Sequence, residues 1–530
     1  MMKNDTSNDT ILTQRTVIVS LLTICFVGLL IRLYFVPQIP LTGDSTNYFV
    51  YAVDTALKGK LTDVYYLANS GWSLFLAGIF STMRLDDPIA LMQTQRFFSI
   101  IISVITIIPL YFLCRKFFNQ RYSLIGVSLF IFEPHIISNS TLGITEPIFL
   151  FFGILCITLF LSKNNFSTYI SFMILGVFSI IRYEGLILFC TLSILYFIKY
   201  RHKKTYFLRY PLVAGIFILT IFPIAYINFE MSERDGFVSE ILDIGGYAYN
   251  VIIQGNADKG DPIYGEENDS NIQHFIPTVT KNTVLMFGLL VFPVLFIFLL
   301  NGTLFIIKDK AFFRIDFQKL TIILISVTML IPTLYAYGRG IEDVRFLFML
   351  FPFFILISLY GISKIDIKRK NVMLISIIGI IFLVSFVYLD FKKIDNDYEK
   401  EVFYITKFIN ERTNIINDNS ADLKYITSSG IIVEWPELPD PVRDSHIPKR
   451  LDLLSAVGYK SLKEFIDVGK EKKLEYIIVD GRDDQPKFLR DLYYNEEKYL
   501  NLEKIFDSSS LDFNYHVKIF KINYGVQNEK

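Results

Sequence analysis

Long apolar runs, each about long enough to cross a lipid bilayer, recur along most of this chain. A membrane-spanning helix needs ~20 mostly apolar residues. Together with a mean hydropathy of +0.41 over 530 residues, such runs exclude a soluble globular protein. They predict an α-helical polytopic membrane protein with about eleven transmembrane helices. The candidate spans are residues 16–36, 91–113, 122–138, 145–162, 168–183, 185–200, 209–229, 283–307, 319–337, 344–362 and 371–390.

Two runs near the N-terminus need a separate interpretation. Residues 71–83 are apolar but short, so we predict a re-entrant or interfacial helix there. The run at 16–31, preceded by Arg15, is similar to a signal sequence. No small-x-small cleavage site follows it and Arg32 interrupts its flank, so an uncleaved signal-anchor helix is predicted.

Basic residues gather in alternate loops, which predicts the orientation of the bundle. Cytoplasmic loops of membrane proteins carry an excess of Lys and Arg. With the N-terminus in the cytoplasm, the basic segments 1–15, 114–121, 163–167, 199–209, 308–319 and 363–370 all fall inside. The first outer loop, 37–90, and the acidic loop 230–282 then fall outside. An odd number of spans also places the tail outside the cell membrane.

The composition changes sharply after Asp390. Helix-like stretches alternate there with short strand-like ones, a pattern typical of a small α/β domain. We therefore predict a transmembrane domain over 1–390 and a soluble extracytoplasmic α/β domain over 391–530. The helix-like stretches are 398–412, 461–473 and 486–494, and the strand-like ones are 424–428, 475–480 and 516–523.

Ionisable residues lie inside or at the predicted outer ends of several spans. A charge at a helix centre costs about 2.5–3.5 kcal/mol on insertion, so such residues usually face a cavity and serve a purpose. Because they share one face, they predict a polar cavity that opens outward. The set is Glu133, His135, Glu146, Arg182, Glu184, Arg339, Glu342, Asp343 and Arg345.

Several of these charges also have a purely structural interpretation. Glu146 followed by Pro147 is suitable chemistry for the first turn of a helix. Arg182 and Glu184 can pair with each other, Arg339 can extend to the headgroups, and His135 can be a satisfied interfacial histidine. In the first outer loop, Asp44 can be an ordinary loop carboxylate.

Other chemistries lack their sequence signals. The cysteines Cys25, Cys114, Cys156 and Cys190 all lie in or beside apolar runs, so neither a structural disulfide nor a cysteine metal site is predicted. No His/Asp cluster has the spacing of metal ligands, and no metal or cofactor is expected. There is no phosphate-binding Gly-x-x-x-x-Gly-Lys-Ser/Thr motif. Cytosolic nucleotides do not reach a charged cavity on the outer face. Any activated substrate would therefore have to be delivered through the lipid.

Five short stretches resemble the C-type glycosyltransferases, most closely family 39, the dolichyl-phosphate-mannose protein mannosyltransferase-like branch. The resemblance covers roughly residues 15–390 and implies the fold of those membrane enzymes. The stretches are Gly43-Asp44-Ser45 with Tyr48, Ala52 and Gly59; residues 96–118; Pro134-His135 through Thr145-Glu146-Pro147; Arg182-Tyr183-Glu184-Gly185; and Asp343-Val344-Arg345-Phe346 through Pro352.

The first loop departs from the family pattern. Many members carry Asp-Glu where this chain has Asp44 and Ser45, so the presumed base is kept and the second carboxylate is missing. A metal site in that loop is therefore in doubt. The tail also lacks a Trp-Trp-Asp motif, because the two tryptophans are Trp72 and Trp435, and this argues against the oligosaccharyltransferase branch.

The resemblance implies an inverting hexosyltransferase that uses a polyprenyl- or dolichyl-phosphate sugar. Asp44 is then the general base on the acceptor hydroxyl of a protein, lipid or glycan. Arg182 and Arg345 supply positive charge to the lipid phosphate, with Glu146, Glu184, His135 and Tyr48 as further donor-binding residues.

Three other functions are alternatives to this one. A transporter or flippase of lipid-linked sugars would place charges near the midplane and show internal repeats, and neither is seen. A polysaccharide ligase remains another enzyme alternative. A receptor or scaffold would not need charges of both signs at several separate span ends. No feature indicates nucleic-acid binding.

Overall fold

The computed structural model places most of the membrane region and parts of the tail. Contacts divide the chain into two compact units, one of residues 1–36, 47–79 and 93–393, the other of residues 37–46, 80–92 and 394–530. The residues that the structure describes are 13–37, 41, 44–61, 67–83, 88–202, 205–249, 272–309, 316–365, 370–392, 401, 424–427, 456, 459–471, 474–480, 486–511 and 513–524.

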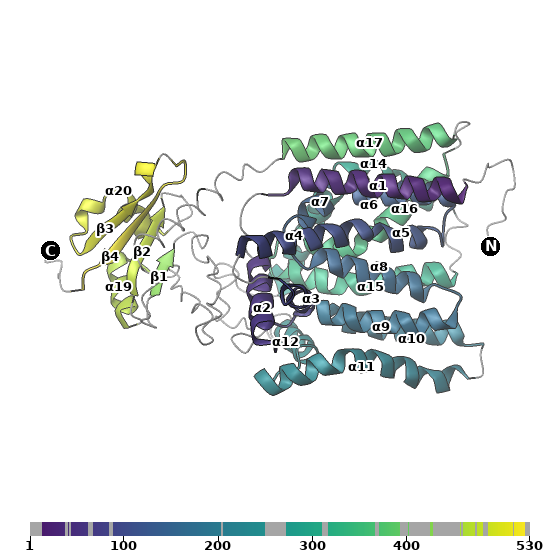
Figure 1. Ribbon diagram of the computed structural model, residues 1–530, viewed down its shortest axis with the longest axis horizontal. Helices are drawn as coiled ribbons and strands as arrows, with labels where there is room; N and C mark the ends of the chain where they lie inside the picture. The colour runs from purple at the N-terminus through teal and green to yellow at the C-terminus, as the bar shows by residue number, and fades with distance from the viewer. Residues whose placement is uncertain are drawn as a thin grey trace. The chain divides into compact units, whose positions relative to one another are not determined.

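The membrane region is built from helices, and its long helices lie side by side with nearly parallel axes (Figure 1). Their bounds are α1 (Gln14–Phe35), α2 (Asp44–Lys58), α3 (Gly71–Phe80), α4 (Pro88–Ile105), α5 (Ile107–Cys114), α6 (Gln120–Ile131), α7 (Pro134–Ser140), α8 (Glu146–Phe160), α9 (Asn165–Ile181), α10 (Glu184–Tyr200), α11 (Tyr206–Ser232), α12 (Val238–Tyr249), α13 (Ile272–Val291), α14 (Val294–Lys308), α15 (Phe317–Gly338), the 3-10 helix η2 (Val344–Leu350), α16 (Phe351–Ser363) and α17 (Lys370–Phe391).

The predicted helical membrane class is confirmed. Among the described residues, 6 helices are long and apolar enough to span a bilayer, and a bent pair brings the number to 7. Shorter apolar helices include α3, α8 and α9, and α3 lies in the stretch predicted as a short re-entrant or interfacial helix. Every predicted span contains helix, but the number that cross the bilayer stays a prediction.

Four predicted spans are not single α-helices, and the one at 91–113 is interrupted only at Thr106, between α4 and α5. The other three differ more. The span predicted at 283–307 is divided between α13 and α14, which are bent by 109° at Phe292-Pro293. The span predicted at 122–138 breaks into α6 and α7 just before Pro134, and the one at 344–362 begins as η2. Proline has no N–H and its ring clashes with the preceding turn, so a continuous helix is disfavoured at Pro293 and at Pro134. Hydropathy alone does not report such breaks.

The first outer loop contains a helix that the sequence analysis did not predict. Asp44 is exposed and is the first residue of α2, while Phe49, Tyr51 and Ala52 of the same helix are buried. A carboxylate in the first turn is favoured by the positive end of the helix dipole.

Arg32 of α1 is fully buried and joins α1 to the broken helix pair α6 and α7. Its Nε donates to Ser140 Oγ at 3.1 Å, and its Nη2 donates to Ser103 Oγ at 3.1 Å. Its Nη1 donates to the carbonyl oxygens of Gly28 at 2.8 Å and Ile131 at 2.9 Å. These are neutral acceptors, so the guanidinium is solvated by the protein in place of water. Arg32 therefore fixes the position of the α6–α7 break.

Replacing Arg32 by Met should destabilise the bundle by about 3 kcal/mol or more, because the variant leaves buried polar partners without a donor. The expected result is a clearly lower melting temperature of the detergent-purified protein. Arg15→Met, on the exposed side of the same helix, is the matched control and should melt like the wild type. Equal melting of Arg32→Met and Arg15→Met would show that Arg32 is not a structural anchor.

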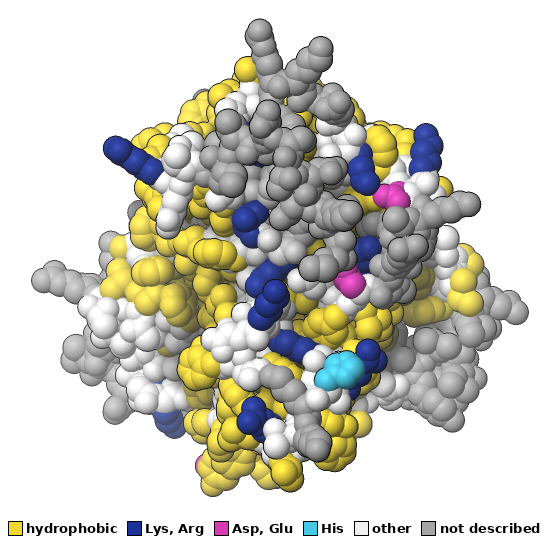
Figure 2. Space-filling view, turned by 90° about the vertical axis from the view of Figure 1, so that its right-hand side faces the viewer, with side chains coloured by type: hydrophobic (Ala, Val, Ile, Leu, Met, Phe, Trp, Pro, Cys, Tyr) yellow, Lys and Arg dark blue, Asp and Glu magenta, His cyan; other side chains and the backbone are white. Residues whose placement is uncertain are grey.

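One end of the bundle is strongly basic. Figure 2 shows the end at which α1 begins, and Lys and Arg far outnumber Asp and Glu on it. The turns after α5, α8 and α10 lie at this end, with Arg115, Lys163 and Arg201 exposed. The helix ends that carry Glu146, Arg182 and their neighbours are the opposite ones, because each helix runs from one end to the other.

The tail contains a four-stranded mixed sheet in the order β1-β2-β4-β3. β1 (Lys424–Thr427) pairs in parallel with β2 (Leu474–Asp480), and β4 (Val517–Ile522) pairs antiparallel with β2 and with β3 (Leu502–Asp507). Helices α19 (Leu462–Glu471) and α20 (Lys487–Tyr494) supply Phe465 and Leu489 to a core shared with the sheet.

These elements confirm an α/β region in the tail. Two predicted helices and three predicted strands are present, whereas β3 was not predicted. Its sequence Leu-Glu-Lys-Ile-Phe-Asp carries few β-branched residues, so it forms a strand because β4 lies beside it. The helix predicted at 398–412 lies outside the described residues, except for position 401.

Candidate functional site

A cluster of charged side chains joins three separate turns at the end of the bundle opposite the basic one. Glu146 begins α8, Arg182 and Glu184 flank the turn between α9 and α10, and Arg345 lies in the first turn of η2. Glu146 and Glu184 are buried, and the side chains of Arg182 and Arg345 are 18% and 30% exposed. The sequence predicted these residues as a set, and the structure brings these four together.

Glu146 lies between the two arginines. Its Oε1 is 3.5 Å from Arg182 Nη1 and 3.6 Å from Arg345 Nη1. Glu184 Oε1 accepts from Arg182 Nη2 at 2.7 Å and from Nε at 3.0 Å. Asp343 Oδ2 accepts from Arg345 Nε at 2.6 Å. The pairing of Arg182 with Glu184 and the contact with Glu146 therefore coexist.

The local sequence explains why these side chains stand at helix ends. Pro147 occupies the first turn of α8, where its missing N–H is not needed. Asp343 caps η2 by accepting from the backbone N–H of Arg345 at 2.8 Å. Asp343 thus holds both the backbone and the side chain of Arg345. Sequence analysis named Asp343 as a charge but not this function.

The guanidinium of Arg182 also packs on an aromatic ring. Its Cζ is 5.0 Å from the ring centroid of Phe149, and that ring stacks on Phe178 at 4.5 Å. A guanidinium over an aromatic face is attracted by the ring quadrupole. The N–H groups of the same guanidinium donate to Glu146 and Glu184. Arg182 is therefore held on several sides and has little freedom to move.

The first outer loop is attached to the same turns. Trp72 Nε1 and Gln95 Nε2 both donate to the carbonyl oxygen of Gly143, at 3.0 and 2.7 Å. Asn69 Oδ1 accepts from the backbone N–H of Tyr183 at 3.4 Å. A Cβ on Gly71 would lie 2.8 Å from the backbone of Ile181, so only glycine permits this close approach. These contacts hold residues 69–72 against the turn of Arg182.

Tyr48 of α2 lies within electrostatic reach of Arg182. Asp44 stands four residues earlier, on the same face of that helix. Asp44 belongs to the second compact unit of the chain and Tyr48 to the first. The role of Asp44 therefore stays a proposal based on the resemblance.

His135 is not part of the charged cluster. Its Nε2 forms a hydrogen bond with the carbonyl oxygen of Leu289 at 2.9 Å, and its ring lies 6.3 Å from that of Tyr388. Its partners in the described chain thus come from α13 and α17. Glu133, buried two residues before His135, caps α7 by accepting from the backbone N–H of His135. Both residues have a clear structural function at the α6–α7 break.

The remaining charges of this end are more exposed. Arg339 lies over the ring of Tyr335, with its Cζ 5.8 Å from the centroid. Glu342 pairs with Lys281 at 3.3 Å, and both side chains are largely exposed. Within the described ranges, no group of three or more His, Cys, Asp or Glu side chains could hold a metal ion.

The fold is similar to that of two solved proteins, an oligosaccharyltransferase and ArnT. The Archaeoglobus fulgidus oligosaccharyltransferase in the apo form matches with a TM-score of 0.58 and 12% identity, over 91% of this chain and 73% of that chain. ArnT from Cupriavidus metallidurans, bound to undecaprenyl phosphate, matches with a TM-score of 0.53 and 9% identity, over 97% of this chain and 99% of that chain.

A sequence-family match covers part of the membrane region. Residues 90–227 match the family model of the dolichyl-phosphate-mannose-protein mannosyltransferases. No curated protein matches the chain. The family match and the shared fold together confirm the predicted resemblance to the C-type glycosyltransferases and support a membrane glycosyltransferase activity.

Proposed function

We propose that the protein transfers a monosaccharide from a polyprenyl- or dolichyl-phosphate donor to an acceptor hydroxyl outside the cell membrane. The main supporting observation is the cluster of Glu146, Arg182, Glu184 and Arg345 at one end of a bundle with this fold. Charged side chains at membrane depth are costly, so their convergence favours a polar substrate handled at the bilayer surface.

Two similar structures support a lipid-phosphate donor. ArnT from Cupriavidus metallidurans was solved with undecaprenyl phosphate. The archaeal oligosaccharyltransferase AglB from Archaeoglobus fulgidus was solved with an inhibitory peptide and a dolichol-phosphate, and matches with a TM-score of 0.55 and 11% identity, over 93% of this chain and 74% of that chain. A lipid phosphate lies at the membrane surface, where these charges are proposed to act. The acceptor can be a protein, a lipid or a glycan.

The two arginines have different proposed functions. Arg182 is held by two carboxylates and an aromatic ring, so it fixes Glu146 and Glu184 and is a positioning residue. Arg345 is more exposed, and its distance to Glu146 is long for an ion pair. The lipid phosphate can take the place of Glu146 at Arg345, and a planar guanidinium binds two phosphate oxygens at once.

The proposed reaction forms one bond and breaks one. The acceptor oxygen attacks the anomeric carbon, the bond from that carbon to the phosphate oxygen breaks, and the configuration inverts. Asp44 accepts the proton of the acceptor hydroxyl, and the polyprenyl phosphate leaves with the bond electrons. Arg345 neutralises the charge that develops on the leaving phosphate. The carboxylate of Asp44 is exposed at the start of α2, where an acceptor can reach it.

The proposed orientation places the basic end in the cytoplasm. The excess of Lys and Arg on that end supports it (Figure 2). The charged cluster, the first outer loop and the acidic loop 230–282 then face outward. The tail from residue 391 is proposed as an extracytoplasmic domain that docks or shields the acceptor.

The proposed function predicts transfer from a defined lipid donor. Native membranes that contain the protein, given a panel of radiolabelled polyprenyl-phosphate sugars, should move label from one donor to an acceptor that membranes without the protein do not label. The anomeric linkage of the product, determined by anomer-specific glycosidases, should be opposite to that of the donor. Retention of configuration would exclude the direct displacement proposed here. Movement of an intact lipid-linked sugar across vesicles without transfer would favour a flippase.

A further inference from the structure

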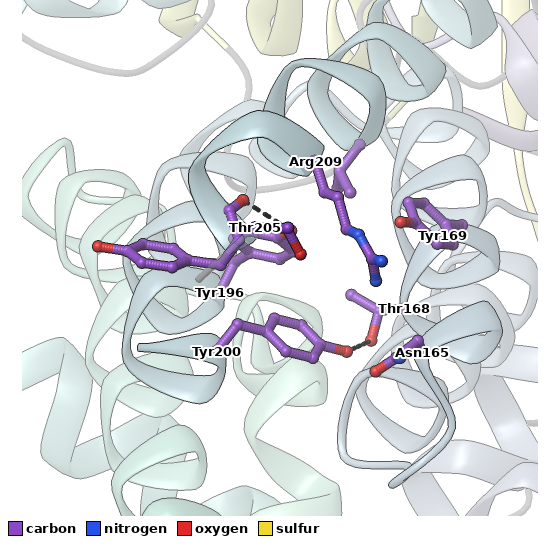
Figure 3. A pocket seen from close by; sticks show the side chains of 9 residues that line it. Asn165, Thr168, Tyr169, Tyr196, Tyr200, Thr205 and Arg209 are labelled. Atoms are coloured by element: carbon purple, nitrogen blue, oxygen red, sulfur yellow. Dashed lines mark hydrogen bonds between the residues drawn. The ribbon is translucent and has the colours of Figure 1, made fainter. Parts of the chain in front are cut away.

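A polar recess lies at the basic end of the bundle, far from the charged cluster along the helices. It is formed where α9 begins, α10 ends and α11 begins (Figure 3). Figure 3 shows Arg209 of α11 facing Tyr169 and Thr168 of α9 and Tyr200 of α10. Three helices thus contribute to one small site that the proposed transfer reaction does not use.

The recess is lined by hydroxyl groups and a cation. Its polar lining includes Thr168, Tyr169, Tyr200 and Thr205, and none of the described residues that line it is Asp or Glu. Hydroxyl groups donate hydrogen bonds to an anion, and a guanidinium adds charge. The side-chain chemistry therefore favours an anion over a cation.

The guanidinium of Arg209 points into this recess (Figure 3). Within the part of the chain that the structure describes, its side chain forms no hydrogen bond or ion pair, although its backbone N–H donates to the carbonyl oxygen of Thr205. Arg115, at the same end, is different, because its Nη1 donates to the carbonyl oxygen of Phe118 at 2.7 Å. Arg209 thus presents its donors to the recess.

A second cation lies beside the hydroxyl groups. Lys199 Nζ donates to Thr168 Oγ1 at 3.0 Å and to the carbonyl oxygen of Phe160 at 2.5 Å. The hydroxyl groups of Thr168 and Tyr200 are 2.7 Å apart. Lys199 therefore raises the positive potential of the recess through a connected set of hydrogen bonds.

The surface beside the recess is apolar. On α11, Phe207, Leu208 and Leu212 are 67%, 82% and 58% exposed. In a membrane helix such side chains face lipid tails, and Tyr residues favour the headgroup level. An anion that enters the recess therefore has acyl chains beside it when it is a lipid, and this favours a lipid over a free ion.

We propose that this recess binds the phosphate group of an anionic membrane phospholipid, with Arg209 as its principal contact. Basic pockets between helices at the cytoplasmic side are suited to anionic headgroups. One of the hydroxyl groups of Thr168 and Tyr200 would add a neutral hydrogen bond, because the other donates within the pair. This inference does not depend on which sugar or acceptor the enzyme uses.

The test measures lipid binding to the detergent-purified full chain by native mass spectrometry. Phosphatidylglycerol should bind more tightly than zwitterionic phosphatidylcholine. Arg209→Gln should weaken phosphatidylglycerol binding about tenfold or more, because a charge-assisted contact is lost. Arg209→Lys should recover part of it. Arg201→Gln, an exposed arginine at the same end of the bundle, is the matched control and should bind like the wild type.

Three outcomes would overturn the proposal. The first is equal binding of the two lipids, which would show that the headgroup charge is not recognised. The second is unchanged phosphatidylglycerol affinity of a folded Arg209→Gln variant. The third is displacement of phosphatidylglycerol by inorganic phosphate at similar concentrations, which would assign the recess to a free phosphate ligand.

Discussion

Asp44→Asn is expected to reduce sugar transfer by about 10²–10⁴-fold, the contribution typical of a general base. The substitution keeps the size of the side chain and removes its ability to accept a proton. Asp44 is exposed at the first turn of α2, so folding should be little affected. Asn is also a good residue at a helix start, and the helix itself should persist. The measurement is the initial rate of label transfer at saturating donor, with the amount of folded protein matched.

Glu342→Gln is the matched control for Asp44→Asn. Glu342 is also an exposed carboxylate, and its ion pair with Lys281 is exposed on both sides. Exposed pairs contribute little, so transfer and melting temperature should stay close to those of the wild type. If Asp44→Asn retains normal transfer, the base lies elsewhere, while the glycosyltransferase class still stands. Loss of transfer together with loss of melting stability would instead indicate a structural function for Asp44.

Arg345→Gln is expected to reduce transfer by about 10²–10³-fold, because it removes a donor to the charge that develops on the leaving phosphate. Arg345→Lys should recover only part of the rate, since an ammonium group lacks the planar pair of N–H donors that binds two phosphate oxygens at once. The decisive measurement compares a donor with a good leaving group, such as an aryl-phosphate sugar, with the polyprenyl-phosphate donor. A stabilised leaving group needs less positive charge beside it. The loss of rate in Arg345→Gln should therefore be smaller with the aryl-phosphate sugar than with the polyprenyl-phosphate donor.

Arg339→Gln is the control for Arg345→Gln. Arg339 lies in the same turn between α15 and η2, and its guanidinium packs over Tyr335. Its replacement should leave the rate within a few-fold of the wild type. An Arg345→Gln variant with the same defect for both donors would show that Arg345 supports the fold of the turn and does not act on the leaving group.

The sequence by itself determined the class of the fold. Long apolar runs have few stable solutions in a bilayer, because every backbone polar group needs an internal partner, and helices provide it. The charged residues at span ends were also identifiable from sequence, since charges are rare at membrane depth. Four of them, Glu146, Arg182, Glu184 and Arg345, do meet in the folded chain.

Only the tertiary structure decided how these charges are paired and what supports them. The distance between Glu146 and the two arginines depends on how α8, α9 and η2 pack, and no local pattern reports that packing. The bend between α13 and α14 and the full burial of Arg32 are set in the same way. His135 carries the same sequence signal as the cluster residues, yet its partners are Leu289 and Tyr388. Hydropathy measures the cost of burying a charge, and the position of its partner is a property of the assembled bundle.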